Sequence, residues 1–302
     1  MTVPAGQVSG IVLVIVAALL LSLKGIVAKL IYAHGVDAIT VSAVRAVLAV
    51  PGFWLYALWS VGRTRLVTAD RRAIRAAMFV GFVAYYLGAY LDFYALTLID
   101  AGLERVLLFV YPAFVVTAQA LIHRRLPQAN VTAAMLLTYL GVFLVIGGVD
   151  RELLAANGFG SILVLLAAAG VALYYMTNAV QARIIGSQVF TVYAMTAAGV
   201  GMAGQFFLTR DVATLAMPAE AWLLMAAMVV FVTVLPLFLL GEGISRVGAV
   251  RGSLVSTVGP PSTLLVAWWL LDETMAPVQL AGSVLVIAGI IVLERFKRIV
   301  AA

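Results

Sequence analysis

Long apolar runs separated by short polar connections make up almost the whole chain. As a helix, an apolar run of about 20 residues spans the roughly 30 Å hydrocarbon core of a bilayer. Ten such windows lie near residues 10–31, 39–60, 76–98, 102–122, 130–149, 160–181, 188–208, 220–240, 249–271 and 277–294. This pattern predicts an all-α membrane protein with ten transmembrane helices.

The windows repeat along the chain at an offset of 148 residues. The aligned pairs include Pro112 with Pro260, Gly141 with Gly289, and Arg124 with Asp272. Each copy holds five windows, an odd number, so the second copy has the opposite orientation in the membrane. We therefore expect two inverted five-helix repeats, at 1–150 and 151–302, with a substrate site between them near the membrane midplane.

The last two windows carry a pattern of glycines, prolines and a polar turn. It consists of Gly241, Gly243, Gly248, Gly252, Gly259-Pro260, the run Trp268–Glu273, Gly282 and Gly289. This pattern resembles the closing half of an EamA-type domain of the drug/metabolite transporter superfamily, whose "LLLGE" signature is similar to WWLLDE, with Asp272 where glycine is usual. The resemblance covers the whole chain and implies five-plus-five helices. It also implies a bacterial inner-membrane exporter of aromatic and neutral amino acids.

Composition agrees with a lipid environment. Of the 302 residues, 65% are hydrophobic and 11% are charged, and the mean hydropathy is +1.14. Soluble domains carry about 25% charged residues. Cysteine is absent, so disulfides and thiolate metal sites are excluded. The N-terminus lacks a basic segment before the first window, so we expect a first membrane helix and not a cleaved signal peptide.

The formal charge of +6 is explained by topology. Most Lys and Arg residues lie on the side of the two termini, whereas the opposite connections hold only Arg105, Arg151 and Arg210. By the positive-inside rule, both termini are cytoplasmic. This distribution favours a membrane protein over a nucleic-acid binder.

Polar side chains inside the windows are expected to face the bundle interior, because a charge facing lipid costs at least about 2.5 kcal/mol. In window 10–31, Lys24 projects from the face opposite Val12, Val16 and Ile26. In window 76–98, the lipid face includes Val80, and the inward face holds Met78, Phe82, Tyr85, Ala89 and Asp92, with Tyr86 at its margin. In window 102–122 the inward face contains Glu104, Leu108 and Tyr111. In window 160–181 it contains Tyr174 and Asn178.

These faces predict a cavity for a small molecule with polar and apolar parts. The candidate substrate-binding residues are Lys24, Phe82, Tyr85, Tyr86, Asp92, Tyr111, Tyr174 and Asn178. Glu104 and Arg45 are candidates for coupling or an ion pair. Asp92 and Glu104 are the candidate proton carriers, and Arg45 is a candidate for a structural or gating role. Arg45 lies in VSAVRAVLAV, which is similar to the family's second-helix pattern, and Lys24-Gly25 stands where the family usually has Trp-Gly.

Several interpretations of this cavity remain open. For a zwitterion, Lys24 receives the carboxylate and Asp92 or Glu104 the ammonium. A quaternary amine in an aromatic cage is the first alternative, although Lys24 would repel it. An organic anion clamped by Lys24 and Arg45 is another. In a purely structural interpretation the carboxylates pair with Lys24, Arg45 or Arg105 to hold helices together.

Other protein classes lack support in the sequence. The histidines, His34 and His123, lie at opposite membrane edges, and no zinc-protease, nucleophile-elbow or phosphate-loop motif occurs. We therefore expect neither an enzyme, nor a cofactor, nor ATP-driven pumping. A channel filter is absent, and a non-transporting scaffold predicts no accessible cavity. Small residues at Gly248 and Gly252, and at Gly141 and Gly282, are interpreted as packing within one chain, so we expect a monomer.

Overall fold

The computed structural model describes residues 5–124, 129–148, 150–247 and 259–300, and this part of the chain is helical without any β-strand. Helices long and apolar enough to cross a membrane lie at Ser9–Ala33, Ala38–Thr68, Arg71–Ala95, Ala101–Ile122, Arg151–Asn178, Gln188–Thr209 and Ala219–Leu240. Shorter apolar helices cover Thr132–Ile146, Ser262–Leu271 and Pro277–Gly289. The fold is that of a multi-pass helical membrane protein.

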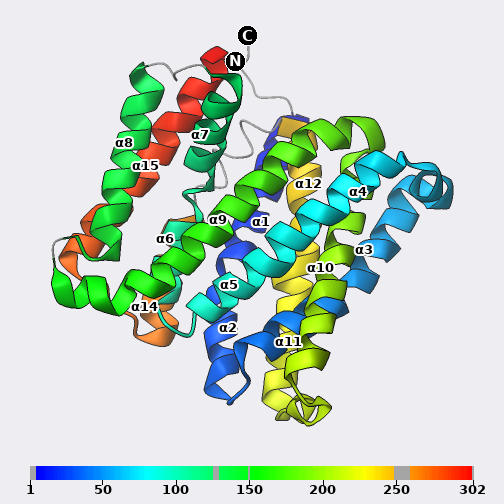
Figure 1. The fold of residues 1–302 in the computed structure, drawn as a ribbon, viewed down its shortest axis with the longest axis horizontal. Coiled ribbons are helices and arrows are strands. Elements are labelled where there is room, and N and C mark those ends of the chain that lie inside the picture. The colour runs from blue at the N-terminus through cyan, green and yellow to red at the C-terminus, as the bar shows by residue number, and fades with distance from the viewer. Residues whose placement is uncertain (1–4, 125–128, 149, 248–258, 301–302) are drawn as a thin grey trace.

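Two series of elements follow one another. The first comprises α1 (Ala5–Ser22), α2 (Lys24–Ala33), α3 (Ala38–Thr68), α4 (Arg71–Gly81), the π-helix η1 (Phe82–Leu87), α5 (Gly88–Ala95), α6 (Ala101–Leu108), α7 (Tyr111–His123) and α8 (Ala129–Ile146). The second comprises α9 (Arg151–Ile185), α10 (Ser187–Thr209), the 3₁₀-helix η2 (Val212–Leu215), α11 (Ala219–Val229), the π-helix η3 (Val230–Val234), α12 (Leu235–Val247), α14 (Gly259–Leu271) and α15 (Pro277–Val300). In Figure 1 both chain ends lie at one end of the bundle, here called the terminal end; the opposite end is called the distal end.

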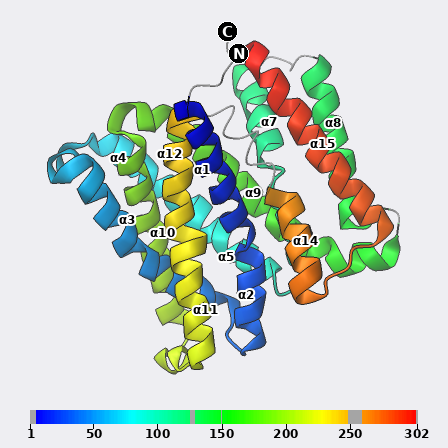
Figure 2. The same cartoon turned by 180° about the vertical axis from the view of Figure 1, so that it is seen from behind.

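The bounds of the two series match at the offset of 148 residues. Helices α4 and α7 begin and end 148 residues before α11 and α14, and η1 and η3 begin at Phe82 and Val230. Two non-glycine residues with positive φ also match, Arg124 (φ 50°) and Asp272 (φ 52°). At this offset α1 corresponds to α9, and α5 corresponds to α12. Helix α1 packs on α12 (Figure 2), and α9 packs on α5 (Figure 1), so each of these contacts joins one series to the other.

Breaks in the predicted helices place charged residues at helix ends. Window 10–31 is divided at Leu23, so that Lys24 is the first residue of α2. Window 102–122 is divided at Phe109 and Val110, which lie between the end of α6 at Leu108 and the start of α7 at Tyr111-Pro112. Proline has no backbone N–H to donate and favours the first turn of a helix. The second break leaves α6 as a separate short helix.

The π-helix corrects the prediction for the faces of window 76–98. A π-helical turn holds more residues than an α-helical turn, so the residues before it are rotated relative to those after it. Val80, which was predicted to face lipid, is only 1% exposed, whereas Phe82, predicted to face inward, is 41% exposed. Tyr85 and Asp92 both line the same cavity, so these two residues share a face as the sequence predicts. Ile26 was also predicted to face lipid and is buried, since α6, α11 and α14 cover α2.

Small residues bring α8 and α15 into direct contact. A Cβ added at Gly141 would lie 2.6 Å from Val286 N, and one at Gly282 would lie 2.6 Å from Val145 N. Both positions therefore need glycine for this close helix crossing. Gly248 and Gly252, the other small residues of the packing prediction, lie outside the described residues.

Candidate functional site

A cavity of about 210 Å³ lies at the junction of the two series of helices. Its lining residues are Ala18, Leu21, Lys24, Arg45, Ala84, Tyr85, Gly88, Ala89, Asp92, Phe93, Arg105, Leu108, Phe109, Tyr111, Ala167, Val171, Val232, Thr233, Leu237 and Leu240. A cavity needs only roughly 10–15 Å³ to hold a single water molecule. This cavity is therefore much larger than a water site and has room for a small metabolite.

Lys24 holds two carboxylates together inside the bundle. Its ammonium contacts Asp92 Oδ2 and donates a hydrogen bond to Glu104 Oε1 at 3.0 Å. The side chains of Lys24 and Glu104 are 16% and 1% exposed. Gly25 allows this arrangement, because a Cβ at Gly25 would lie only 3.1 Å from the side chain of Ala101 on α6. The structure thus contains the pairing of both carboxylates with Lys24 that the purely structural interpretation of the sequence described.

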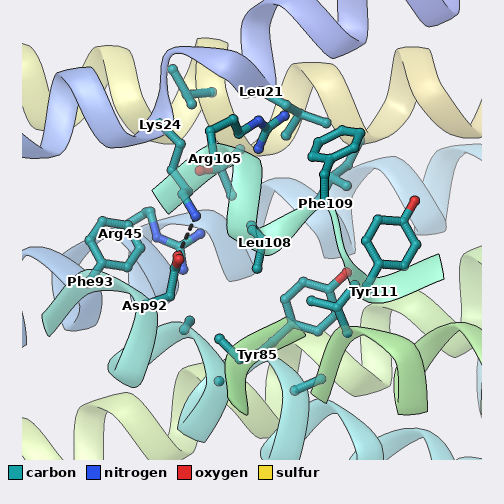
Figure 3. Close-up of a pocket in the computed structure, with 18 of the residues that line it drawn as sticks. Leu21, Lys24, Arg45, Tyr85, Asp92, Phe93, Arg105, Leu108, Phe109 and Tyr111 are labelled. Carbon is teal, nitrogen blue, oxygen red and sulfur yellow. Dashed lines mark hydrogen bonds and ion pairs between the residues drawn. The ribbon is translucent and has the colours of Figure 1, made fainter. Parts of the chain in front are cut away.

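Arg45 enters the cavity from α3 beside this cluster. Its guanidinium carbon lies 4.9 Å from the centroid of the Phe93 ring, within the range of a cation–π contact. Figure 3 shows the guanidinium next to Asp92 and Phe93. Its Nε is buried and has no hydrogen-bond partner among the described residues.

Arg105 is a further cation of the site, which the sequence analysis assigned to a connection. It lies on α6, is 7% exposed, and its guanidinium carbon is 4.9 Å from the centroid of Phe109. The signal was present in the sequence: Arg105 follows Glu104 inside an apolar window, where a charge is costly unless it faces the interior. Phe93 and Phe109, which carry these cation–π contacts, were also not predicted.

Tyr85 and Tyr111 lie across the cavity from Lys24 and Asp92 (Figure 3). The ring of Tyr174 meets that of Tyr85 edge to face, with centroids 4.7 Å apart, and the Tyr174 hydroxyl lies 3.3 Å from Thr191 Oγ1. Tyr174 therefore stands behind Tyr85 and supports it.

Five of the predicted residues do not line the cavity, namely Tyr174 behind Tyr85 and also Phe82, Tyr86, Asn178 and Glu104. Phe82 and Tyr86 pair with each other at 4.6 Å between centroids, and the Tyr86 ring covers Gly201 on α10. Asn178 lies on α9 beyond the cavity, with its Oδ1 buried and without a partner among the described residues. Glu104 does not line the cavity and reaches it through Lys24.

The second series supplies an apolar wall. Its lining residues are Ala167, Val171, Val232, Thr233, Leu237 and Leu240, which carry no charge. The charged lining residues all come from α2, α3, α5 and α6. All charged side chains of the cavity therefore come from the first series, and the wall that the second series supplies is uncharged.

Ion pairs at the distal end join the two series. Glu273 pairs with Lys29 at 2.8 Å and accepts hydrogen bonds from the backbone N–H groups of Ala101 (3.2 Å) and Gly102 (3.3 Å) at the start of α6. Lys29 also lies 3.4 Å from Asp100.

A second distal ion pair connects Asp37, the N-cap of α3, to Arg210 at 3.1 Å. Burial opposes ionisation of Asp37, but hydrogen bonds from Thr40 and Ile39 and the charge of Arg210 outweigh it and lower the pKa of Asp37. This pair therefore remains charged well below neutral pH. Within the described ranges, no group of three or more His, Asp or Glu side chains is arranged to hold a metal ion.

Comparison with known proteins identifies a family for this architecture. The EamA-like transporter family matches residues 8–147 and again residues 158–295. A protein of Bacillus subtilis (strain 168) described as "Uncharacterized transporter YcbK" is 31% identical over 279 residues, which cover 91% of this chain and 89% of the relative. A solved structure described as "Crystal structure of protein" has a TM-score of 0.66 at 15% identity and covers 98% of this chain and 99% of its own. That likeness concerns the fold.

Proposed function

The chain belongs to the EamA-like transporter family, and on this premise we propose that it exports aromatic and neutral amino acids by alternating access, without ATP hydrolysis. The observation that carries the proposal is the cavity with one charged and one apolar wall. A zwitterion with an apolar side chain has the matching chemistry, because its head group needs charged partners and its side chain gains from burial.

The proposal includes ten membrane spans in two inverted repeats, residues 1–150 and 151–302. It is supported by the matching element bounds, by the exchanged helix pairs and by the two separate matches to the family. Inverted repeats give a carrier two related conformations, each open to one side. We also propose a monomer as the transporting unit, because Gly141 and Gly282 serve close helix packing within one chain.

The distal ion pairs support a closed gate at that end. We place the termini in the cytoplasm of a bacterium and the distal end outside its inner membrane, on the charge distribution of the sequence. Glu273, Lys29 and the start of α6 would then separate when the cavity opens outward. Because α6 also carries Glu104, opening of this gate moves the ion cluster as well.

An organic monoanion is the second candidate substrate. The cluster contains three cations, Lys24, Arg45 and Arg105, and two carboxylates, Asp92 and Glu104, so its formal charge is positive. This excess favours a ligand with a carboxylate. It disfavours a quaternary amine, the first alternative drawn from the sequence, because like charges repel in a medium of low dielectric constant.

Counterflow in liposomes tests the proposed function. Proteoliposomes are loaded with unlabelled phenylalanine, leucine or choline, and entry of the labelled compound is followed. We expect phenylalanine and leucine to exchange and choline not to exchange, and the exchange to need no ATP. Exchange of choline alone would contradict the proposal.

A further inference from the structure

Arg45 differs from the other basic residues that the structure places in or near the cavity. Lys24 and Lys29 each contact two carboxylates. Arg105 has a further interaction in addition to its cation–π contact with Phe109. Among the described residues, no carboxylate lies within ion-pair distance of Arg45, and its buried Nε donates no hydrogen bond.

The positive charge and the N–H donors of the Arg45 guanidinium are only partly compensated by its neighbours. It has five N–H donors in a planar fork, which match the two oxygens of a carboxylate. The Phe93 ring supplies a cation–π contact but accepts none of these hydrogen bonds in the plane of the guanidinium. The Nε donor of Arg45 therefore has no partner among the described residues, and the side chain lines the cavity, which brings the guanidinium within reach of a ligand there.

Lys24 is in the opposite situation. Its ammonium is already bound by Asp92 and Glu104, and a ligand carboxylate at Lys24 would have to compete with both. Asp92 nevertheless keeps one buried oxygen, Oδ1, that accepts no hydrogen bond from the described residues. The cavity thus offers an unused cationic donor and an unused anionic acceptor close to each other (Figure 3).

We propose that Arg45, and not Lys24, binds the carboxylate of the substrate, with Asp92 Oδ1 beside it as the acceptor for an ammonium. This inference rests on the proposed function and assigns its binding residue. It predicts a carboxylate as the required group of the substrate, because the two oxygens of a carboxylate match the planar N–H fork of Arg45.

The test uses purified protein in proteoliposomes and detergent. Phenylalanine counterflow is measured in the native protein and in the Arg45→Gln and Arg45→Lys variants, with 3-phenylpropionate and phenethylamine as competitors. These compounds lack the ammonium and the carboxylate, respectively. The Arg65→Gln variant, which removes the same charge from an exposed position on α3, is the matched control.

We expect 3-phenylpropionate to compete with phenylalanine and phenethylamine to compete weakly in the native protein. Arg45→Gln should raise the KM for phenylalanine at least tenfold and abolish competition by 3-phenylpropionate, because a charge-assisted hydrogen bond is lost. Arg45→Lys should be intermediate, since an ammonium lacks the planar fork. Arg65→Gln should behave like the native protein.

Thermal unfolding separates binding from folding. Arg45→Gln leaves two cations with two carboxylates, so its midpoint without ligand should equal or exceed that of the native protein, while the stabilisation by phenylalanine should disappear. A lower midpoint with all ligands weakened equally would identify Arg45 as a structural residue and overturn the inference. So would a KM for phenylalanine within twofold of the native value.

The outcomes also distinguish this inference from the proposed function. Native protein that exchanges 3-phenylpropionate through Arg45 but no amino acid supports the role of Arg45 and contradicts amino-acid export. Phenylalanine exchange that is independent of Arg45 does the reverse. Native protein that neither exchanges nor is stabilised by any carboxylate contradicts both.

Discussion

The two walls of the cavity come from halves of the chain with matching backbones and different chemistry. At the offset of 148 residues, Lys24 corresponds to Ala172, Arg45 to Tyr193 and Asp92 to Leu240. The helix bounds are kept, as in α4 and α11, while the charges are not. In the proposed function, the repeated backbone would be a symmetric frame for movement. The different side chains would orient the substrate in the cavity.

The charged wall should be the more sensitive half. Removing one partner of a buried ion pair costs about 3–5 kcal/mol, because the remaining charges lose their compensation. Lys24→Met should therefore lower the free energy of unfolding by about this amount and abolish counterflow. The triple variant Lys24→Met, Asp92→Asn, Glu104→Gln should recover much of the stability and no transport. Thermal unfolding in detergent measures both, and a Lys24→Met protein as stable as the native one would contradict the ion cluster.

The apolar wall should affect affinity rather than folding. Leu240 lines the cavity at the position that corresponds to Asp92. Leu240→Ala removes contacts to an apolar ligand side chain and should raise the KM for phenylalanine about tenfold, the usual scale for such pockets. The KM for alanine should change less than threefold. Equal changes for both amino acids would show that the apolar wall does not bind the side chain.

The contact between the halves at the distal end should control access. Glu273→Ala removes the acceptor of the Ala101 and Gly102 N–H groups and one of the two carboxylate partners of Lys29. The outward-open population should rise about fivefold. A cysteine at Leu108 reports this as faster labelling by an impermeant maleimide from outside, in a chain without native cysteine. Glu220→Ala, an exposed residue at the same end, is the control, and unchanged labelling in Glu273→Ala would contradict the gate.

The matching turns of the two halves give the smallest effect. Arg124 and Asp272 both have positive φ, a conformation that glycine adopts without strain and that aspartate tolerates better than arginine. Asp272→Gly and Arg124→Gly should each raise the free energy of unfolding, by up to about 1 kcal/mol, with the larger gain at Arg124. Thermal unfolding of the two variants measures the difference. Lower stability of either variant would show that its side chain has a structural role.

The apolar windows predict the helices because span length and composition are set by the bilayer, whatever the tertiary packing. Lys24, Asp92 and Glu104 follow from the sequence for the same reason, since a charge inside such a window must face the interior. The π-helix η1 does not follow from the sequence, because its hydrogen-bond shift leaves no clear sequence pattern. Phe82 and Val80 were therefore assigned to the wrong faces.

The apolar wall was also not predicted. Leu237 and Leu240 lie in a window whose residues are apolar on every side, so periodicity does not separate the cavity face from the lipid face. Arg105 was missed because the sequence analysis assigned it to a connection, although it lies inside window 102–122, where a charge must face the interior.

Protection of single cysteines by ligands tests the two-wall cavity most directly. One cysteine replaces Ala89 on α5, on the charged wall near Asp92, and another replaces Val171 on α9, on the apolar wall. Phenylalanine should protect both positions from a small maleimide, whereas glycine should protect position 89 and leave position 171 reactive. Equal protection of both positions by glycine, or protection of neither by phenylalanine, would contradict a cavity with one charged and one apolar wall.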